Sequence, residues 1–172
     1  MAIIEAIATT YLEADAATVT FGSIPATYEH LQVRGLNAAT GATTGQAYYI
    51  ELNGSAGTAY SSHIIRAHTS TVGANAQTGN ARIQIFDGIH GSSTDRTEYA
   101  MMMMDIFDYA NANKNTSVML NGGQSMSSTE RRRWLGSGLW DSTAAVTQIK
   151  FTPSNGNMRR GSEFTLYGIK SS

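Results

Sequence analysis

Apolar and polar residues alternate in several short stretches of the chain. The clearest alternation covers residues 17–21, 30–34, 48–52, 82–86 and 145–151. In an extended segment, alternate side chains point to opposite sides, so a two-residue repeat places one side on a core and the other in solvent. Each stretch therefore predicts a half-buried β-strand. Shorter or less regular apolar stretches predict further strands at residues 117–120, 134–140 and 162–169.

The longest apolar run covers residues 99–109 and contains the methionines from Met101 to Met104. Both alternate sets of positions are apolar there, which predicts a central strand buried on both faces, with the methionines filling the core. The length would also allow a helix. Asp105 and Asp108 interrupt a wide helical face, however, and a strand is therefore the expectation.

Turn residues separate these stretches. Asn53-Gly54 is a strong hairpin signal, and residues 121–123 and 153–156 are further predicted turns. Residues 59–68 fit a short helix or an irregular strand, and residues 70–80 have the small, polar composition of a surface loop. We therefore expect about eight to ten strands in an antiparallel sandwich or barrel. Strands do not alternate with helices along the sequence, as they would in a fold built from βαβ units.

The start of the chain lacks a clear strand period. Ile3, Ile4 and Ile7 are apolar but do not alternate with polar residues. We expect residues 1–10 to form an N-terminal arm and residues 11–172 to form a single β-sandwich domain.

Composition narrows the possible functions. Charged residues make up 15% of the 172 residues, against about 25% on average, and the net charge is −1. A protein that grips nucleic acid through phosphates needs a Lys/Arg surplus, so a nucleic-acid partner is not expected. No apolar run reaches about 18 residues, so no membrane partner is expected. The absence of cysteine excludes disulfides and thiol chemistry.

Candidate catalytic and metal-binding residues are few. His63, His68 and Asp87 could hold a metal, but no strand or helix period places them on one face. Asp105 and Asp108 could act as paired carboxylates, although residues three apart on a strand point to opposite faces. No nucleophile elbow or phosphate loop is present. We therefore expect no enzyme activity, no catalytic or metal-binding residue and no cofactor.

The basic run Arg131-Arg132-Arg133 is interpreted as a contact with carboxylates of a neighbouring subunit or surface, or as a solvated strand end. On a strand, Arg132 would face away from its two neighbours. The aromatic residues could stack on sugar rings, but core or edge positions of a sandwich explain them more simply; they are Tyr48, Tyr49, Trp134 and Trp140.

Several motifs resemble a recurrent structural module of tailed-bacteriophage virions. They are residues 105–111 (DIFDYAN), 113–116 (NKNT), 138–147 (GLWDSTAAVT) and 162–169 (SEFTLYGI), with 11–12 (YL), 19–25 (VTFGSIP) and the turn 53–54 in the first half. The resemblance implies a jelly-roll-like β-sandwich, commonly assembled as a homotrimer, and carries over no catalytic residue.

Such a module occurs in capsid decoration (cement) proteins and in phage fibres. Because the module fills nearly the whole chain, we expect a non-enzymatic decoration protein on the outer capsid surface of the virion, made in the cytoplasm of the host bacterium. Its expected partners are the major capsid protein and further copies of itself, with Ile3, Ile4, Ile7, Arg131 and Arg133 as interface residues. The alternative is a tail-fibre or head-fibre module that binds a host surface glycan through residues 70–80 and 88–97.

Overall fold

The computed structural model describes residues 3–42, 45–91, 98–126 and 130–170. These residues form twelve strands: β1 (Ile3–Tyr11), β2 (Val19–Phe21), β3 (His30–Ala39), β4 (Gly45–Leu52), β5 (Tyr60–His68), β6 (Thr71–Asn80), β7 (Ile83–Gly91), β8 (Ala100–Ile106), β9 (Thr116–Met126), β10 (Glu130–Trp140), β11 (Ile149–Pro153) and β12 (Glu163–Lys170). Within the described ranges, no helix is long and apolar enough to cross a membrane.

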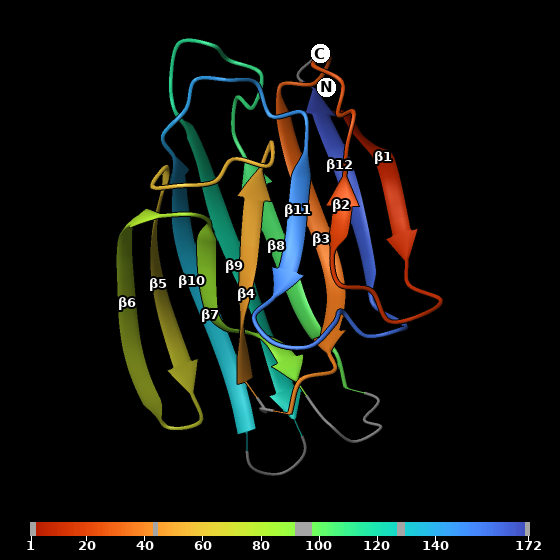
Figure 1. Cartoon of the computed structure of the whole chain (residues 1–172), viewed down its shortest axis with the longest axis vertical. Coiled ribbons are helices and arrows are strands. Elements are labelled where there is room, and N and C mark those ends of the chain that lie inside the picture. Colours follow the sequence, from red (N-terminus) through yellow and green to blue (C-terminus); the bar gives the residue numbers. More distant parts are fainter. Residues whose placement is uncertain (1–2, 43–44, 92–97, 127–129, 171–172) are drawn as a thin grey trace.

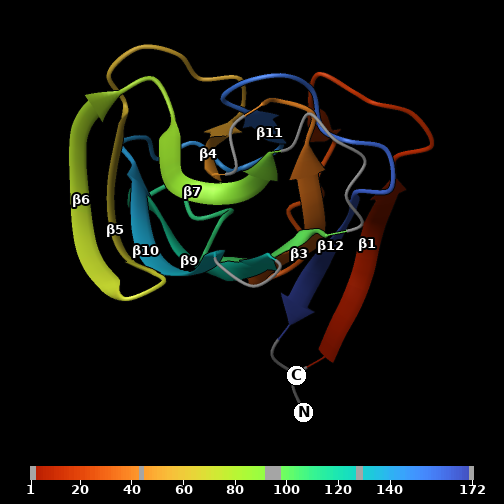
Figure 2. The same cartoon turned by 90° about the horizontal axis from the view of Figure 1, so that it is seen from below.

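The strands form two layers. The large sheet has the antiparallel order β1-β12-β3-β8-β9-β10-β5-β6, and the small sheet has the order β2-β11-β4-β7. The end of β3 joins the layers, because Ala38 and Ala39 pair in parallel with His90 and Gly91 of β7. Figure 1 shows β1 and β6 at opposite edges of the molecule, and Figure 2 shows the large sheet curling around β7.

Stacked aromatic rings connect the two layers in the core. Tyr48 of β4 stacks on Phe151 of β11, with ring centroids 5.6 Å apart. Phe151 in turn stacks on Phe164 of β12 in the large sheet, at 5.3 Å. All three side chains are fully buried. Burial of such rings is the main driving force for closing a sandwich that has no disulfide.

The close approach of β7 to the large sheet requires a glycine. A Cβ on Gly138 of β10 would lie 2.7 Å from Cδ1 of Ile83 and 2.8 Å from Cγ2 of Val118. Gly138 therefore leaves room for the Ile83 side chain between the layers.

The predicted all-β, jelly-roll-like sandwich is confirmed, with twelve described strands instead of eight to ten. One of the strands beyond the predicted number is β6, because residues 70–80 were expected to form a loop. The ambiguous stretch 59–68 is strand β5 from residue 60 onward, and its neighbour β6 completes a long hairpin with it. Gly, Ala and Asn dominate β6, so backbone pairing with β5 decides its conformation more than side-chain preference does.

The expected arm is also a strand. Ile3–Tyr11 pairs with β12 from Ile3 opposite Lys170 to Tyr11 opposite Glu163, with a bulge between Ala6 and Ala8. That bulge shifts the side-chain alternation by one residue, which explains why the sequence lacks a clear period there. Residues 3–11 therefore belong to the large sheet.

Two further boundaries differ from the prediction. The expected turn at residues 121–123 lies within β9, which continues to Met126. Residues 145–148 are not a strand, because the side chain of Asn53 binds their backbone. Its Oδ1 accepts hydrogen bonds from the amides of Thr147 (2.8 Å) and Gln148 (3.0 Å), and its Nδ2 donates to the carbonyl of Ala145 (2.7 Å).

Candidate functional site

The outer side of the large sheet carries large apolar side chains in the open. We call this surface the contact face; it is the outward side of β12, β3, β8, β9 and β10. Leu36, Met101 and Leu135 are each more than half exposed, at 53%, 57% and 53%, and Met119 is 48% exposed. Isolated exposed apolar residues are ordinary on a protein surface, but several on neighbouring strands indicate a binding surface.

The outer side of the small sheet is different. Glu51 of β4 pairs with Lys150 of β11 and lies 3.7 Å from Arg82. The Arg82 guanidinium also covers the ring of Tyr49, 4.3 Å from its centroid. Charged groups thus cover the outer side of the small sheet. On the contact face Arg34 similarly covers the ring of Tyr167, 5.1 Å from its centroid, but Leu36, Met101 and Leu135 stay exposed.

A groove of about 540 Å³ runs across the contact face. Its walls come from all five strands of that face, and they include Arg34, Leu36, Met101, Met103, Asn121, Arg133, Glu163, Thr165 and Tyr167. The carbonyl oxygen Oδ1 of Asn121 is buried and has no hydrogen-bond donor among the described residues.

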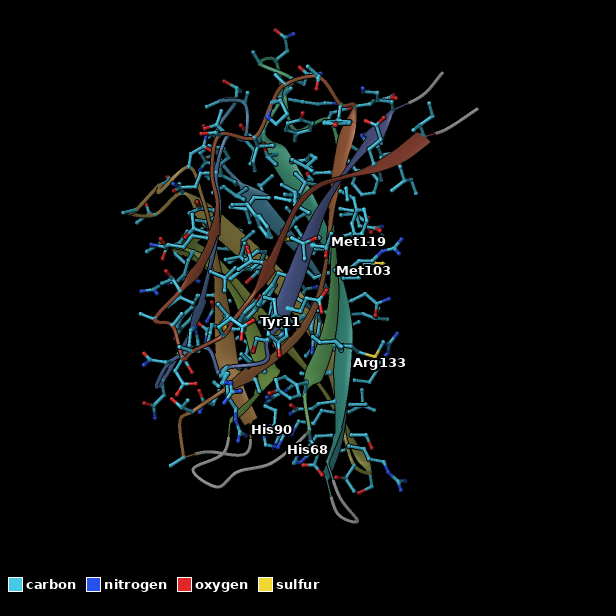
Figure 3. The ribbon with its side chains drawn as sticks, turned by 90° about the vertical axis from the view of Figure 1, so that its right-hand side faces the viewer. Tyr11, His68, His90, Met103, Met119 and Arg133 are labelled. Carbon is cyan, nitrogen blue, oxygen red and sulfur yellow. The ribbon has the colours of Figure 1, made fainter. Side chains whose placement is uncertain are left out.

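Strand register fixes the order of side chains across the face. One row runs Glu163, Leu36, Met101, Gly123, Arg133 from β12 to β10. The next row runs Thr165, Arg34, Met103, Asn121, Leu135. Figure 3 shows Met103, Met119 and Arg133 pointing away from the body of the sandwich on the same side. The first row places apolar side chains in the middle and charged ones at the ends.

The methionine run was expected to be buried on both faces, and this prediction is wrong. Met102 and Met104 are buried in the core, but Met101 is exposed and Met103 is half-buried on the contact face. No layer covers the outer side of β8 within the described chain. The continuous apolar run is therefore explained by a core on one side and the contact face on the other.

The second candidate surface is the free edge of β1, which we call the β1 edge. Ile3 and Ile4 are 42% and 54% exposed there, whereas Ile7 packs against the core. Glu5 is the only charged residue of this strand. Figure 2 shows the start of β1 and the end of β12 projecting beyond the body of the sandwich. An exposed edge without lysine or proline can pair with a strand of another chain.

The arginine run lies on β10 as the alternation predicted. Arg131 and Arg133 are exposed on the outer side, and Arg132 is half-buried on the inner side. One guanidinium nitrogen of Arg133 donates to the carbonyl of Gly122 at 3.3 Å. Arg133 is thereby held at the rim of the groove.

The candidate metal-binding residues do not converge. His63 and His68 lie five apart on β5 and face opposite sides, with His63 exposed. The side chain of Asp87 lies outside what the structure describes. The described residues contain no group of three histidine, aspartate or glutamate side chains that could hold a metal ion.

The two candidate carboxylates are also separated. Asp105 faces outward on β8 and accepts a hydrogen bond from Nε2 of Gln32 at 2.6 Å. Asp108 follows β8, where its backbone amide donates to Nδ1 of His30 and its carboxylate binds Lys114. The hydrogen bond from Lys114 lowers the pKa of Asp108. Each carboxylate therefore has a structural partner, which is Gln32 for Asp105 and Lys114 for Asp108.

Three of the four aromatic residues considered for sugar stacking are in the core. Tyr48, Trp134 and Trp140 are buried, and only Tyr49 lies partly in the open beneath Arg82. Burial raises the pKa of Tyr48 well above its ordinary value. Of the two loops proposed for glycan binding, residues 71–80 and 88–91 belong to strands, and residues 92–97 lie outside the described ranges.

Sequence reasoning did not find the contact face. Leu36 lies two residues beyond the predicted strand 30–34, Met101 lies in the run that was expected to be buried on both faces, and Leu135 lies in the predicted strand 134–140. Strand order is needed to see that these positions are neighbours, and one sequence does not give that order.

Comparisons with known proteins find likeness in architecture only. No protein-family model and no curated protein matches the chain. Among solved structures, the galectin LEC-6 of Caenorhabditis elegans is similar over 95% of this chain and 96% of that one, with 8% identity and a TM-score of 0.36. The alginate lyase vAL-1 from Chlorella virus is similar over 95% and 83%, with 6% identity and a TM-score of 0.33. Both likenesses concern the β-sandwich and carry no argument about activity.

Proposed function

We propose that this chain is a non-enzymatic structural protein of a tailed-bacteriophage particle, and more narrowly a decoration protein that binds the outer surface of the head. The β1 edge is the observation that supports this proposal. It offers a nine-residue strand with one free side, exposed isoleucines and little charge. The resemblance of the sequence to virion modules supplies the class of partner, which is the major capsid protein.

The β1 edge binds by adding its strand to a strand of the capsid protein. Main-chain hydrogen bonds along the edge supply affinity, and side chains on alternate sides supply specificity. Ile3 and Ile4 are adjacent, so they reach pockets on opposite sides of the combined sheet. A chain attached in this way across a joint between capsomers adds contacts that must break before the joint opens.

Arg131 and Arg133 are not part of this edge, because they lie on β10 in the middle of the large sheet. Ile7 anchors β1 against the core from the inner side. Of the five residues expected at an interface, Ile3 and Ile4 are therefore assigned to capsid binding, and Arg133 is considered below.

The proposal is tested by mixing the purified full chain with phage heads assembled in its absence and pelleting the heads. We expect the chain to pellet with the heads, and Ile4→Lys to reduce the bound amount at least about tenfold, since a buried lysine and a lost isoleucine cost more than about 1.4 kcal/mol. The matched control is Val72→Lys on β6, the opposite edge, where Val72 is 78% exposed.

A chain that stays in the supernatant with every head preparation overturns the proposal. Loss of binding in Val72→Lys with full binding in Ile4→Lys moves the contact to the other edge and contradicts the role of β1. Binding to host cells or surface polysaccharide without binding to heads supports the receptor-binding alternative instead.

A further inference from the structure

The contact face carries opposite charges at equal distances from its centre. Strand β8 is the middle of the five strands β12-β3-β8-β9-β10. Glu163 lies two strands to one side of Met101 in the same row, and Arg133 lies two strands to the other side. At a strand spacing of about 4.8 Å, each charge is about 10 Å from the central strand.

This arrangement is complementary to itself. A two-fold axis in the plane of the face and parallel to β8 would stack a second copy face to face and exchange its two sides. Glu163 of each copy would then face Arg133 of the other, giving two equivalent ion pairs at the rim. Neither residue has an ion-pair partner among the described residues of its own chain.

The apolar centre fits the same symmetry. Met101 and Met103 lie on the central strand and would each meet their own copies. Leu36, one strand to the side, would come opposite Gly123, which has no side chain to obstruct it. Methionine side chains adapt to irregular contacts, so they suit the position where identical residues meet.

The second row adds a polar match. Arg34 and Asn121 lie one strand to either side of Met103 and would face each other across the axis. Gln32 takes one donor of the Arg34 guanidinium, at 2.7 Å, and leaves others free to reach the amide of Asn121. Asp105, on the central strand, would also lie opposite its own copy; this like-charge contact opposes pairing, and the hydrogen bond that its carboxylate accepts from Nε2 of Gln32 partly offsets it.

We propose that the contact face binds the same face of a second copy of this chain about a two-fold axis parallel to β8. The size of the surface is enough for a small specific interface. Its five strands at about 4.8 Å and six residues at about 3.4 Å give about 500 Å² on each copy. The two copies together would bury about 1,000 Å², which is the lower size of a specific protein–protein interface.

This interface goes beyond the proposed function and does not depend on it. Head binding is assigned to the β1 edge, and pairing is assigned to the outward side of β8 and its neighbours. A chain that forms pairs but fails to pellet with heads keeps this interface and loses the proposed function. A two-fold pair also differs in mass from the trimer that the resemblance implies.

Charge reversal tests the interface by sedimentation equilibrium of the full chain at micromolar concentration. We expect the wild type to have twice the mass of the 18.4 kDa chain. Arg133→Glu and Glu163→Arg each place like charges together at both rims, which should weaken pairing at least about tenfold. An equimolar mixture of the two variants should regain the double mass, because one chain then carries only acidic groups at the two rim positions and the other only basic groups.

The matched control is Arg131→Glu, on the same strand and the same side but outside the two rows, and it should pair as the wild type does. Thermal unfolding of each variant reports whether it folds. A monomeric or trimeric wild type overturns the proposal. So do folded single variants that pair normally, or a mixture that stays monomeric.

Discussion

The indole of Trp134 lies directly against the backbone of Gly122. A Cβ on Gly122 would lie 2.1 Å from Cζ2 of Trp134 and 2.5 Å from the carbonyl oxygen of Met101. Trp134 is 1% exposed, and its ring fills the inner side of β9 where the two layers meet. The glycine in the middle of a strand is therefore a packing requirement, not a turn.

Gly122→Ala should lower the free energy of unfolding by about 3 kcal/mol or more, because both the ring and a backbone carbonyl must move. Urea unfolding followed by tryptophan fluorescence measures the change. Gly73→Ala on β6 is the control, since a Cβ there meets nothing within 4 Å. A small effect at position 122, similar to that at position 73, would contradict the packing described for Trp134.

Asn53→Ala should also destabilise the fold. The substitution removes four side-chain hydrogen bonds to residues 145–148, three to the backbone and one to the hydroxyl of Thr147. Each is worth about 1 kcal/mol. It also places alanine at φ 54°, where asparagine is better tolerated. We expect a loss of about 2–4 kcal/mol in the free energy of unfolding by urea titration. Asn113→Ala, in an exposed turn, should stay within about 0.5 kcal/mol of the wild type.

The pair of Asp108 and Lys114 predicts a specific pH dependence. The hydrogen bond from Lys114 lowers the pKa of Asp108 in the folded chain below its value in the unfolded chain. Its stabilising contribution is therefore complete above the unfolded pKa, about 3.9, and is lost as the pH falls through the folded pKa.

Lys114→Gln should consequently reduce the loss of stability between about pH 5 and about pH 2. Urea midpoints measured across this range provide the comparison. Lys170→Gln, which leaves the Asp108 contact intact, should retain that contribution. An unchanged acid dependence in Lys114→Gln would contradict the assignment of the pKa shift to this pair.

Met101→Lys should separate association from stability. Met101 is 57% exposed, so the substitution costs the isolated fold little, within about 0.5 kcal/mol. At the centre of the contact face, however, it places two lysines together in a self-paired chain. Sedimentation velocity should show a shift toward the monomer while the thermal midpoint stays near that of the wild type. A Met101→Lys chain that associates unchanged would contradict the use of this face.

Local patterns were enough to predict much of the fold. Alternation located β2, β3, β4, β7 and the start of β11, and a less regular apolar stretch located β12. The turn at Asn53-Gly54 is present with both residues at positive φ. The errors have physical causes that lie outside the local sequence. The bulge at residues 6–8 hid the period of β1, Trp134 explains a glycine that suggested a turn, and the side chain of Asn53 replaced sheet pairing at residues 145–148.

The candidate surfaces could be predicted only in part. Ile3, Ile4 and Arg133 were identified from their residue types, and their exposure agrees with a surface role. The contact face forms because β3, β8, β9 and β10 are neighbours in the sheet. This strand order places Leu36 opposite Met101, although the two residues are far apart in the sequence. The trimer implied by the resemblance to virion modules stays a prediction.

Hydrogen–deuterium exchange of the chain, free and bound to phage heads, tests the proposed function most directly. Backbone amides of residues 3–11 should exchange rapidly on the free side of β1 and become protected when heads are present. Peptides from the small sheet, such as residues 45–52, serve as the internal control and should not change. Protection confined to other strands, or none at all with heads in excess, would contradict the proposal that this chain decorates heads through the β1 edge.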